Sequence, residues 1–236
     1  MKIAESHIDI SCPESEIYEP LLALDGKHIL ELGCGSAQIT RNIATTGSER
    51  KITALEVDQI AHDKNLQIKD LPNVTFGLAG AQAIPLPDES VDVALMFKSL
   101  HHVPLELMES SMQEIRRVLK PGALLYISEP IFAGEFNEIL RLFHDEQKVR
   151  EAAFNTVKKV VQDGLFELRE EIFFNSPMCF ESFAEFESNT INATHSHHSL
   201  DEALYQQVKQ RFEKHLGDDG ANFWMPMRVD LLQRPQ

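Results

Sequence analysis

The sequence predicts an α/β protein with a mainly parallel β-sheet and helices packed against it. Short apolar runs alternate with amphipathic segments through the first half of the chain, which is typical of a parallel sheet covered by helices. The length of 236 residues suits one large domain. With 43% hydrophobic residues and no repeat or low-complexity tract, the composition is that of an ordinary globular protein.

The first half of the chain supplies five expected strands and a crossover helix. The apolar face of the helix precedes Pro121-Gly122, which we expect to end it in a turn. The expected strands are His28–Leu32, Ile52–Glu56, Val74–Leu78, Val91–Phe97 and Ala123–Ser128. The helix face consists of Met108, Met112, Ile115 and Leu119.

After Glu129-Pro130 the pattern changes to inserted helices and two further strands. Apolar stripes predict the first two helices, and two Ser-x-x-Glu capping boxes predict two more. We expect the last helix to carry Leu216 and to end at Gly217. The stripes are Phe136, Ile139, Leu140 and Phe143, then Phe154, Val157 and Val161; the boxes are Ser182/Glu185 and Ser199/Glu202; the strands are Leu165–Phe174 and Phe223–Leu232.

These elements predict a single domain over residues 1–236 with three parts. Residues 1–130 form the core, residues 131–220 a cap with an inserted strand, and residues 221–236 the final strand. The inserted part is too long for a connection, since connections normally run to about 4–6 residues. We therefore expect a substrate cap over the carboxyl edge of the sheet, where ligands bind in open α/β folds.

Charge and cysteine content exclude several classes of partner. The chain has 22 basic and 37 acidic residues, a net charge of −15, and no basic stripe that would attract nucleic acid. Cys12, Cys34 and Cys179 form no Cys-x-x-Cys pair, which favours a reduced, cytoplasmic protein. We expect neither a signal peptide nor a membrane span. The oligomeric state stays open.

A glycine turn follows the first expected strand. In the stretch ILELGCGSAQIT, residues 29–40, an apolar run ends at Glu31 and two glycines, Gly33 and Gly35, precede a polar helical segment. Such a turn lets backbone amides approach a ligand closely. The turn contains no lysine, which a phosphate-binding loop requires, and Gln38 stands where a dinucleotide fingerprint has its third glycine.

The glycine turn also carries a resemblance to a known family. Residues 31–37, ELGCGSA, resemble the Glu/Asp-x-Gly-x-Gly-x-Gly/Ala turn of class I methyltransferases that use S-adenosylmethionine (SAM). Four further blocks follow in the order of that family: ALEVD at 54–58, AIPLPDESVD at 83–92, LHHVP at 100–104 and RVLKPG at 117–122. The resemblance covers residues 18–130, and weakly 225–235. It is strongest to the small-molecule branch that includes ubiquinone and menaquinone methyltransferases.

The resemblance implies a Rossmann-like, mainly parallel seven-stranded sheet with an antiparallel C-terminal edge strand and a helical cap. It also implies SAM as cofactor. Glu31, Gly33 and Gly35 suit the amino-acid end of SAM, and Glu56 is placed to accept the ribose hydroxyls. Four further residues complete the expected cofactor site: Val57, Ala81, Gln82 and Phe97. Asp58 is expected to cap the next helix.

One residue departs from the pattern of the family. Where the family commonly has an aspartate that accepts the adenine amino group, this chain has Gly80. Either the Ala81 amide and Gln82 hold adenine instead, or affinity falls by the roughly 0.5–1.5 kcal/mol of one neutral hydrogen bond.

Four residues are candidates for catalysis. Lys98 could bind a substrate carboxylate or act as a base, and equally could be a surface lysine. His102 and Glu129 lie at strand ends, although the family's His-His pair is mostly structural. His197 belongs to the run His195-Ser196-His197-His198, which could supply a base but lacks the ligands that complete a zinc site, so we expect no metal.

The predicted function is SAM-dependent methylation of a small molecule, on an oxygen, nitrogen, sulfur or carbon atom. Methylation of a nucleic-acid adenine is disfavoured, because residues 97–100 read FKSL and lack an Asn/Asp-Pro-Pro-Tyr/Phe clamp. A non-catalytic relative that binds a partner through an acidic cap is the alternative, motivated by Gly80 and opposed by the intact Glu31 and Glu56.

Overall fold

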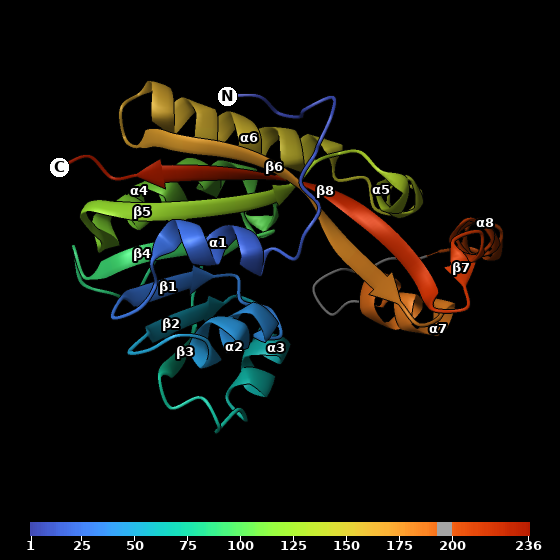
Figure 1. Ribbon diagram of the computed structural model, residues 1–236, viewed down its shortest axis with the longest axis horizontal. Coiled ribbons are helices and arrows are strands. Elements are labelled where there is room, and N and C mark those ends of the chain that lie inside the picture. Colours follow the sequence, from blue (N-terminus) through green and yellow to red (C-terminus); the bar gives the residue numbers. More distant parts are fainter. Residues whose placement is uncertain (193–199) are drawn as a thin grey trace.

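A mixed β-sheet forms the centre of the molecule. The computed structural model describes residues 1–192 and 200–236. Its strands lie in the order β3-β2-β1-β4-β5-β8-β6, and a short strand, β7, pairs with β8 (Figure 1). All pairs among the first five strands are parallel, whereas β8 is antiparallel to β5 and to β6. The strands are β1 (His28–Leu32), β2 (Lys51–Glu56), β3 (Val74–Leu78), β4 (Val91–Phe97), β5 (Leu119–Pro130), β6 (Glu167–Phe180), β7 (Leu216–Gly217) and β8 (Gly220–Gln233).

The predicted fold class is confirmed, with one change in strand position. The C-terminal strand is antiparallel as predicted, but it lies between β5 and β6, so that β6 forms the edge of the sheet. β8 can occupy this inner position because both of its long sides find partners, β5 over 124–130 and β6 over 167–180. β5 also begins earlier than predicted, at Leu119, which is therefore a strand residue and not part of the preceding helix.

Helices cover both faces of the sheet. Apolar residues of α1 and α2 pack on one face, and those of α4 and α6 pack on the other. α6 was expected in the cap, but Ala153, Val157 and Val160 join the same core cluster as Met112 and Ile115 of α4. The helices are α1 (Ser15–Leu22), α2 (Gln38–Thr45), α3 (Gln59–Asn65), α4 (Met108–Val118), α5 (Glu135–Leu140), α6 (Gln147–Gln162), α7 (Phe183–Phe186) and α8 (Glu202–Glu213), with 3-10 turns at Leu100–His102 and Leu105–Leu107 and a π-helix at Glu187–Ile191.

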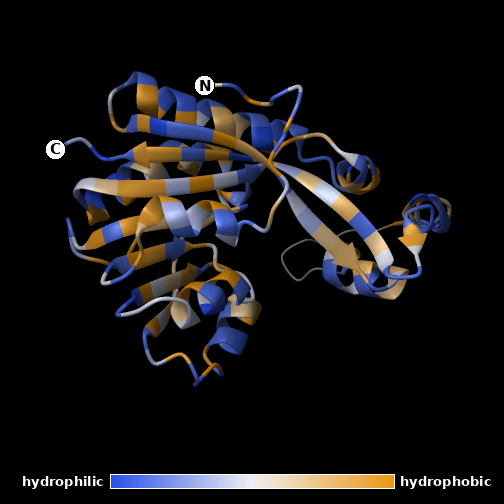
Figure 2. Cartoon of the chain, viewed as in Figure 1, coloured by the Kyte–Doolittle hydropathy of each residue, from blue (hydrophilic) through white to orange (hydrophobic). Residues whose placement is uncertain are grey.

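A separate lobe lies beyond the carboxyl ends of the parallel strands. β6 and β8 continue past the sheet as a two-stranded ribbon, and the lobe consists of α5, α7, the π-helix, α8 and β7 around the end of this ribbon (Figure 1). Its core is mainly aromatic, whereas the cores on the two faces of the sheet are mainly aliphatic. Figure 2 shows hydrophobic residues both along the strands of the sheet and in the lobe. The buried residues are Phe136, Ile139, Leu140, Phe180, Phe183, Phe186, Ile191, Val208, Phe212, Ala221 and Phe223.

In the lobe, the start of α7 agrees with the prediction, whereas the bounds of α8 differ from it. Ser182 caps α7 as predicted, since its hydroxyl accepts a hydrogen bond from the Glu185 amide. α8 is capped by Asp201, and Ser199 lies outside the described residues. α8 ends at Glu213, so Leu216 belongs to β7 and not to the helix.

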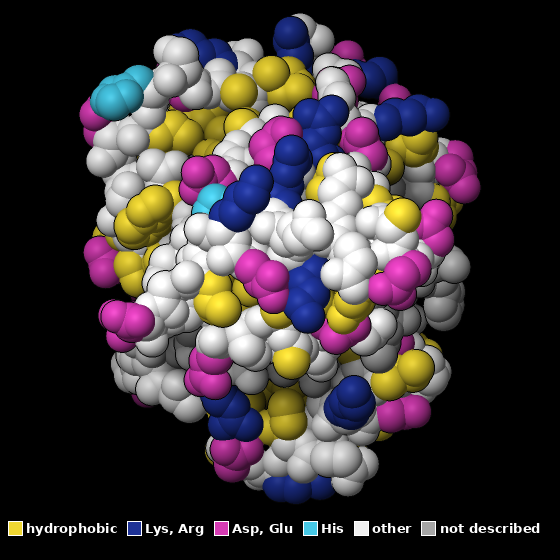
Figure 3. All heavy atoms as spheres, turned by 90° about the vertical axis from the view of Figure 1, so that its right-hand side faces the viewer, with side chains coloured by type: hydrophobic (Ala, Val, Ile, Leu, Met, Phe, Trp, Pro, Cys, Tyr) yellow, Lys and Arg dark blue, Asp and Glu magenta, His cyan; other side chains and the backbone are white. Residues whose placement is uncertain are grey.

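The described helices and one face of the surface were compared with what a membrane span or a nucleic-acid binding surface requires. None of the helices within residues 1–192 and 200–236 is long and apolar enough to cross a membrane. On the face shown in Figure 3, acidic and basic side chains lie interspersed, with hydrophobic side chains between them. This face shows no continuous basic surface of the kind that binds nucleic acid.

Candidate active site

The glycine turn connects β1 to α2 through several left-handed residues. The φ angles are +76° at Gly33 and +52° at Gly35, and Ala37 at the start of α2 has a φ of +60°. A Cβ atom at Gly33 would lie 2.7 Å from the Cβ of Ser99, whereas a Cβ at Gly35 would meet nothing within 4 Å. Gly33 is therefore required by close packing as well as by backbone conformation, and Gly35 borders open space.

Glu31 lies at the end of β1, beneath the turn. Its side chain is buried, and the Thr40 hydroxyl donates a hydrogen bond of 2.6 Å to Glu31 Oε2. Burial raises the pKa of Glu31 to about 7; the Thr40 bond lowers it in part, and the nearby charge of Glu56 raises it further. A carboxyl group that titrates near neutrality is thus held next to the start of α2.

Glu56 ends β2 and holds the turn in shape. Its Oε2 accepts a hydrogen bond of 2.6 Å from the Gly35 amide, and its Oε1 accepts bonds of 2.7 and 2.8 Å from the Val57 and Asp58 amides. A carboxylate offers about four acceptor positions. Glu56 can therefore accept one further donor without losing a backbone bond, and a second only by releasing one.

The other residues expected around the cofactor are placed as follows. Val57 is 67% exposed, and Ala81 is buried in the core. The side chain of Gln82 occupies the space beside Gly80, because a Cβ on Gly80 would lie 2.3 Å from Gln82 Oε1. Phe97 is buried and packs edge-on against Tyr18 with ring centroids 5.4 Å apart. The predicted helix cap at Asp58 is present: its carboxylate accepts hydrogen bonds from the amides of Ile60 and Ala61.

A cavity of about 430 Å³ lies between the carboxyl ends of β4 and β5, the start of α6 and the lobe. Basic, acidic and imidazole groups line it together with apolar side chains. The polar groups are Lys98, His101, His102, His144, Glu146, Arg150, Ser176, Asn189 and Thr190, and the apolar ones are Pro130, Phe136, Leu140, Pro177, Met178 and Met225. A cavity of this size and mixed lining suits a small organic molecule.

Lys98 and Ser99 connect the cavity to the glycine turn. Lys98 has a φ of +51°, an uncommon conformation for a residue with a side chain, and its amide donates a hydrogen bond to the Ser128 carbonyl. Its ammonium group lies 3.4 Å from Glu14 Oε2. The Ser99 hydroxyl donates a 2.7 Å hydrogen bond to the Leu32 carbonyl, which ties the residue after Lys98 to the residue before the turn.

A buried network of charges surrounds His101. Its Nδ1 is hydrogen-bonded to Glu129 Oε2, and its Nε2 lies 3.6 Å from Glu146 Oε1. Burial lowers the pKa of His101, but the two carboxylates outweigh burial and raise the pKa to about 9. Burial raises the pKa of Glu129. The charge of His101 and the hydrogen bonds to Glu129 outweigh burial and hold this pKa below its ordinary value.

Glu146 joins this network to α6. Its Oε2 accepts a hydrogen bond of 2.5 Å from Arg150 Nη2, and its Oε1 lies 3.0 Å from His144 Nε2. Burial raises the pKa of Glu146, but His101, His144 and Arg150 more than offset burial, so the pKa is well below its usual range. The cavity floor thus holds an ionised carboxylate.

The structure brings together some of the predicted catalytic residues. Lys98 and His102 both line the cavity. Glu129 is 2% exposed and accepts bonds from the Leu100 amide and His101, so it can act only through His101. His197 lies outside the described residues.

Sequence reasoning did not identify His144, Glu146 or Arg150. The only local signal is the i,i+4 spacing of Glu146 and Arg150 at the start of α6, which is typical of an ordinary helix ion pair. Their importance comes from the ion pair between Glu146 and His101. These two residues are 45 positions apart in the sequence.

Comparison with known proteins agrees with this geometry. Residues 30–127 match the Methyltransf_11 family model, a methyltransferase domain. An O-methyltransferase, rstn1, from Aspergillus nomiae is 33% identical over 138 residues, which are 55% of this chain and 59% of that protein. The chain spans less than two-thirds of the length of the curated relatives that it matches. The resemblance to class I methyltransferases is therefore confirmed for residues 30–127.

Two solved structures show the same fold. A SAM-dependent methyltransferase from Methanosarcina mazei has a TM-score of 0.57 at 18% identity, covering 93% of this chain and 97% of that one. The [4+2]-cyclase SpnF has a TM-score of 0.59 at 20% identity, covering 94% of this chain and 79% of that one. Because the second is named for a different reaction, the fold by itself does not decide the chemistry.

Proposed function

We propose that this protein transfers a methyl group from SAM to a small molecule. The observation that carries the proposal is the glycine turn of the segment that matches the methyltransferase family: open space above Gly35, flanked by the carboxylates of Glu31 and Glu56. SAM, when bound, supplies a methyl group already activated by a positively charged sulfur. The protein must then align an acceptor atom with it and provide for the loss of a proton.

The residues around the turn suit each part of SAM. Glu31, buried and able to ionise near neutrality, suits the ammonium group of the amino-acid end. The remaining acceptor position of Glu56 suits a ribose hydroxyl. The carboxamide of Gln82, which fills the space beside Gly80, suits the adenine amino group in place of the missing acid. Val57 and Ala81 would complete the adenine wall.

The cavity suits a partly apolar acceptor with a polar group. Its apolar lining residues can hold a hydrocarbon or ring system, and its polar lining residues can bind a hydroxyl, amine or carboxylate. Lys98, next to the turn, is placed to bind an anionic part of the acceptor. The lobe, which supplies part of the apolar wall, is the cap that determines the substrate. The proposed acceptor is a small molecule and not a nucleic acid.

The alternative of a non-catalytic, partner-binding protein has no support in residues 1–192 and 200–236. The turn, Glu31 and Glu56 are in place, and a cavity adjoins them. A reducing compartment such as the cytoplasm fits the three unpaired cysteines.

Calorimetric titration with SAM and with S-adenosylhomocysteine tests the proposal. We expect both to bind with micromolar dissociation constants. Glu56→Ala should weaken binding by about 10- to 150-fold, corresponding to the roughly 1.5–3 kcal/mol of a charged hydrogen bond. Glu213→Ala, at an ion pair on α8, is the matched control and should bind as the unmodified protein does.

A cofactor analogue separates ribose binding from support of the turn. Removing the ribose hydroxyls of S-adenosylhomocysteine should weaken binding to the unmodified protein but not to Glu56→Ala, which has no side-chain group to accept a bond from them. Equal losses in both proteins would show that Glu56 only supports the backbone. No binding of either cofactor form to protein freed of ligand would overturn the proposed function itself.

A further inference from the structure

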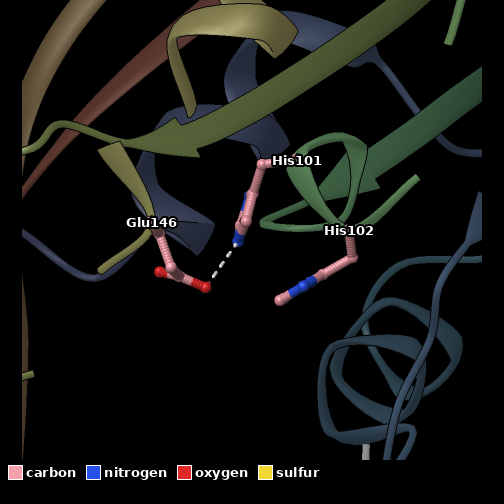
Figure 4. A group of neighbouring side chains, drawn as sticks. All are labelled: His101, His102 and Glu146. Atoms are coloured by element: carbon pink, nitrogen blue, oxygen red, sulfur yellow. Dashed lines mark ion pairs between the residues drawn. The ribbon is translucent and has the colours of Figure 1, made fainter. Parts of the chain in front are cut away.

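Two histidines and a glutamate converge at the floor of the cavity. His101 and His102 lie in the 3-10 turn after β4, and Glu146 directly precedes α6. One ligand atom from each lies within 4.8 Å of the other two. Figure 4 shows the side chains of His101 and Glu146 pointing toward each other and that of His102 extending into the same space. None of these residues belongs to the glycine turn.

The contacts behind these side chains hold two of them in orientation. Glu129 bonds to Nδ1 of His101, which leaves Nε2 directed toward Glu146. Arg150 binds Oε2 of Glu146, and Oε1 lies 3.0 Å from His144 Nε2 and 3.6 Å from His101 Nε2. A carboxylate behind the distal nitrogen of a histidine is the arrangement that commonly orients histidine ligands of metal ions.

The spacing fits a transition-metal ion. Ligand atoms about 2.0–2.2 Å from a tetrahedral metal are about 3.3–3.6 Å apart, and His101 Nε2 lies 3.6 Å from Glu146 Oε1. The widest separation, 4.8 Å, would close by side-chain rotation of His102, which is exposed. Two imidazoles and one carboxylate with further positions open are typical of catalytic Zn²⁺ and non-haem Fe²⁺ sites, whereas Mg²⁺ and Ca²⁺ prefer oxygen ligands.

We propose that His101, His102 and Glu146 bind one divalent transition-metal ion at the floor of the cavity, and that the ion displaces the Nε2 proton of His101 to solvent. The ligands are set among residues that also line the space for the acceptor, so an oxygen atom of the acceptor can complete the coordination. This second role rests on the proposed function: the ion would lower the pKa of a hydroxyl, whose proton leaves to water, and so favour acceptors that carry a hydroxyl group. Metal binding itself does not depend on methyl transfer.

Titration of the full-length protein, stripped with a chelator, with Zn²⁺ and Co²⁺ tests the site. We expect one ion per chain by calorimetry and a visible Co²⁺ spectrum with nitrogen ligands. His102→Ala and Glu146→Gln should each weaken binding at least about tenfold. Glu129→Gln, a change behind the ligands, should weaken it about 10- to 100-fold.

Two control variants make the result specific. His7→Ala alters an exposed histidine of the N-terminal segment and should leave metal binding unchanged. Replacement of His195, His197 and His198 by alanine should also leave it unchanged. If that triple variant lost the ion, or if His102→Ala and Glu146→Gln kept it, the metal would be bound elsewhere and the proposal would be wrong.

SAM binding to the same variants separates the two proposals. His102→Ala and Glu146→Gln should bind SAM as the unmodified protein does, because both residues lie outside the segment 31–58 that forms the turn and its two carboxylates. SAM binding without any binding of Zn²⁺ or Co²⁺ would overturn the metal site alone. Metal binding without SAM binding would overturn the methyltransferase function and leave the site intact.

Discussion

The glycine turn and the lobe are stabilised by different kinds of interaction. The turn is held by backbone hydrogen bonds and two carboxylates, all within residues 31–58. The lobe is held by aromatic side chains from four separate segments, 136–143, 180–191, 204–212 and 221–223. A site made from backbone geometry needs particular residues at particular positions, whereas an aromatic core accepts many combinations of similar volume. The methyltransferase family model accordingly matches residues 30–127, which include the turn, and not the residues of the lobe.

The largest expected effect is a loss of folding stability when the aromatic core of the lobe is changed. Phe212 is fully buried in the lobe, and its ring lies 4.9 Å from that of Phe186. Phe212→Ala should lower the free energy of unfolding by about 3–5 kcal/mol, the usual cost of a cavity left by a deleted phenylalanine. Urea unfolding measures the loss. Leu216→Ala, which changes a 44% exposed residue of the lobe, should cost far less.

SAM affinity of Phe212→Ala sharpens the comparison. If the lobe contributes only to binding of the acceptor, the folded variant should bind SAM within about twofold of the affinity of the unmodified protein. This corresponds to a difference in binding free energy of about 0.4 kcal/mol. A loss of SAM affinity that parallels the loss of stability would show that the lobe and the turn form one unit.

The next effect distinguishes the two glycines of the turn. Gly33→Ala combines a left-handed backbone with a Cβ 2.7 Å from that of Ser99, so we expect a cost of about 2–4 kcal/mol from strain and overpacking. Gly35→Ala meets no atom within 4 Å and should cost about 1–2 kcal/mol. Thermal unfolding with and without SAM measures both.

The SAM affinity of these glycine variants gives a second comparison. Gly35 borders the space assigned to the cofactor, so Gly35→Ala should lose more SAM affinity than its small loss of stability accounts for. If Gly35→Ala bound SAM normally, the cofactor would not approach the turn at this residue.

The sequence predicted those features that depend on neighbouring residues. Five strands, the Asp58 cap and the glycine turn are encoded in short apolar runs or local spacing, and the structure contains all of them. The inner position of β8 could not be read in this way, because strand order depends on pairing between distant segments. For the same reason α6 was assigned to the cap, since an apolar stripe does not say which surface it covers.

The residues of the proposed site follow the same division. Glu31 and Glu56 could be predicted because they lie at strand ends next to a recognisable turn. Glu146 and Arg150 were not found, because an ion pair at the start of a helix is common and only folding brings it to His101. Glu129 was predicted as a candidate for catalysis, but in the structure it is buried and bonds to His101 and to the Leu100 amide.

The smallest expected effect concerns the pH dependence of SAM binding. The pKa of Glu31 is raised to about 7, chiefly by burial. Folded protein therefore favours protonated Glu31: the stability that this provides is complete below pH 4.5, the ordinary value, and is lost as the pH rises through 7. SAM affinity should change in the opposite direction, because only ionised Glu31 attracts the ammonium group.

Calorimetry at pH 6 and pH 7.5 measures this change. Ionisation of Glu31 rises over this interval while an α-amino group with a pKa near 7.8 loses part of its charge, so SAM should bind about fivefold more tightly at pH 7.5. Glu31→Gln should bind weakly at both values and lose this increase. An unmodified protein with equal affinity at both values would place the ammonium group away from Glu31. The turn would then be a support for the ribose and adenine alone.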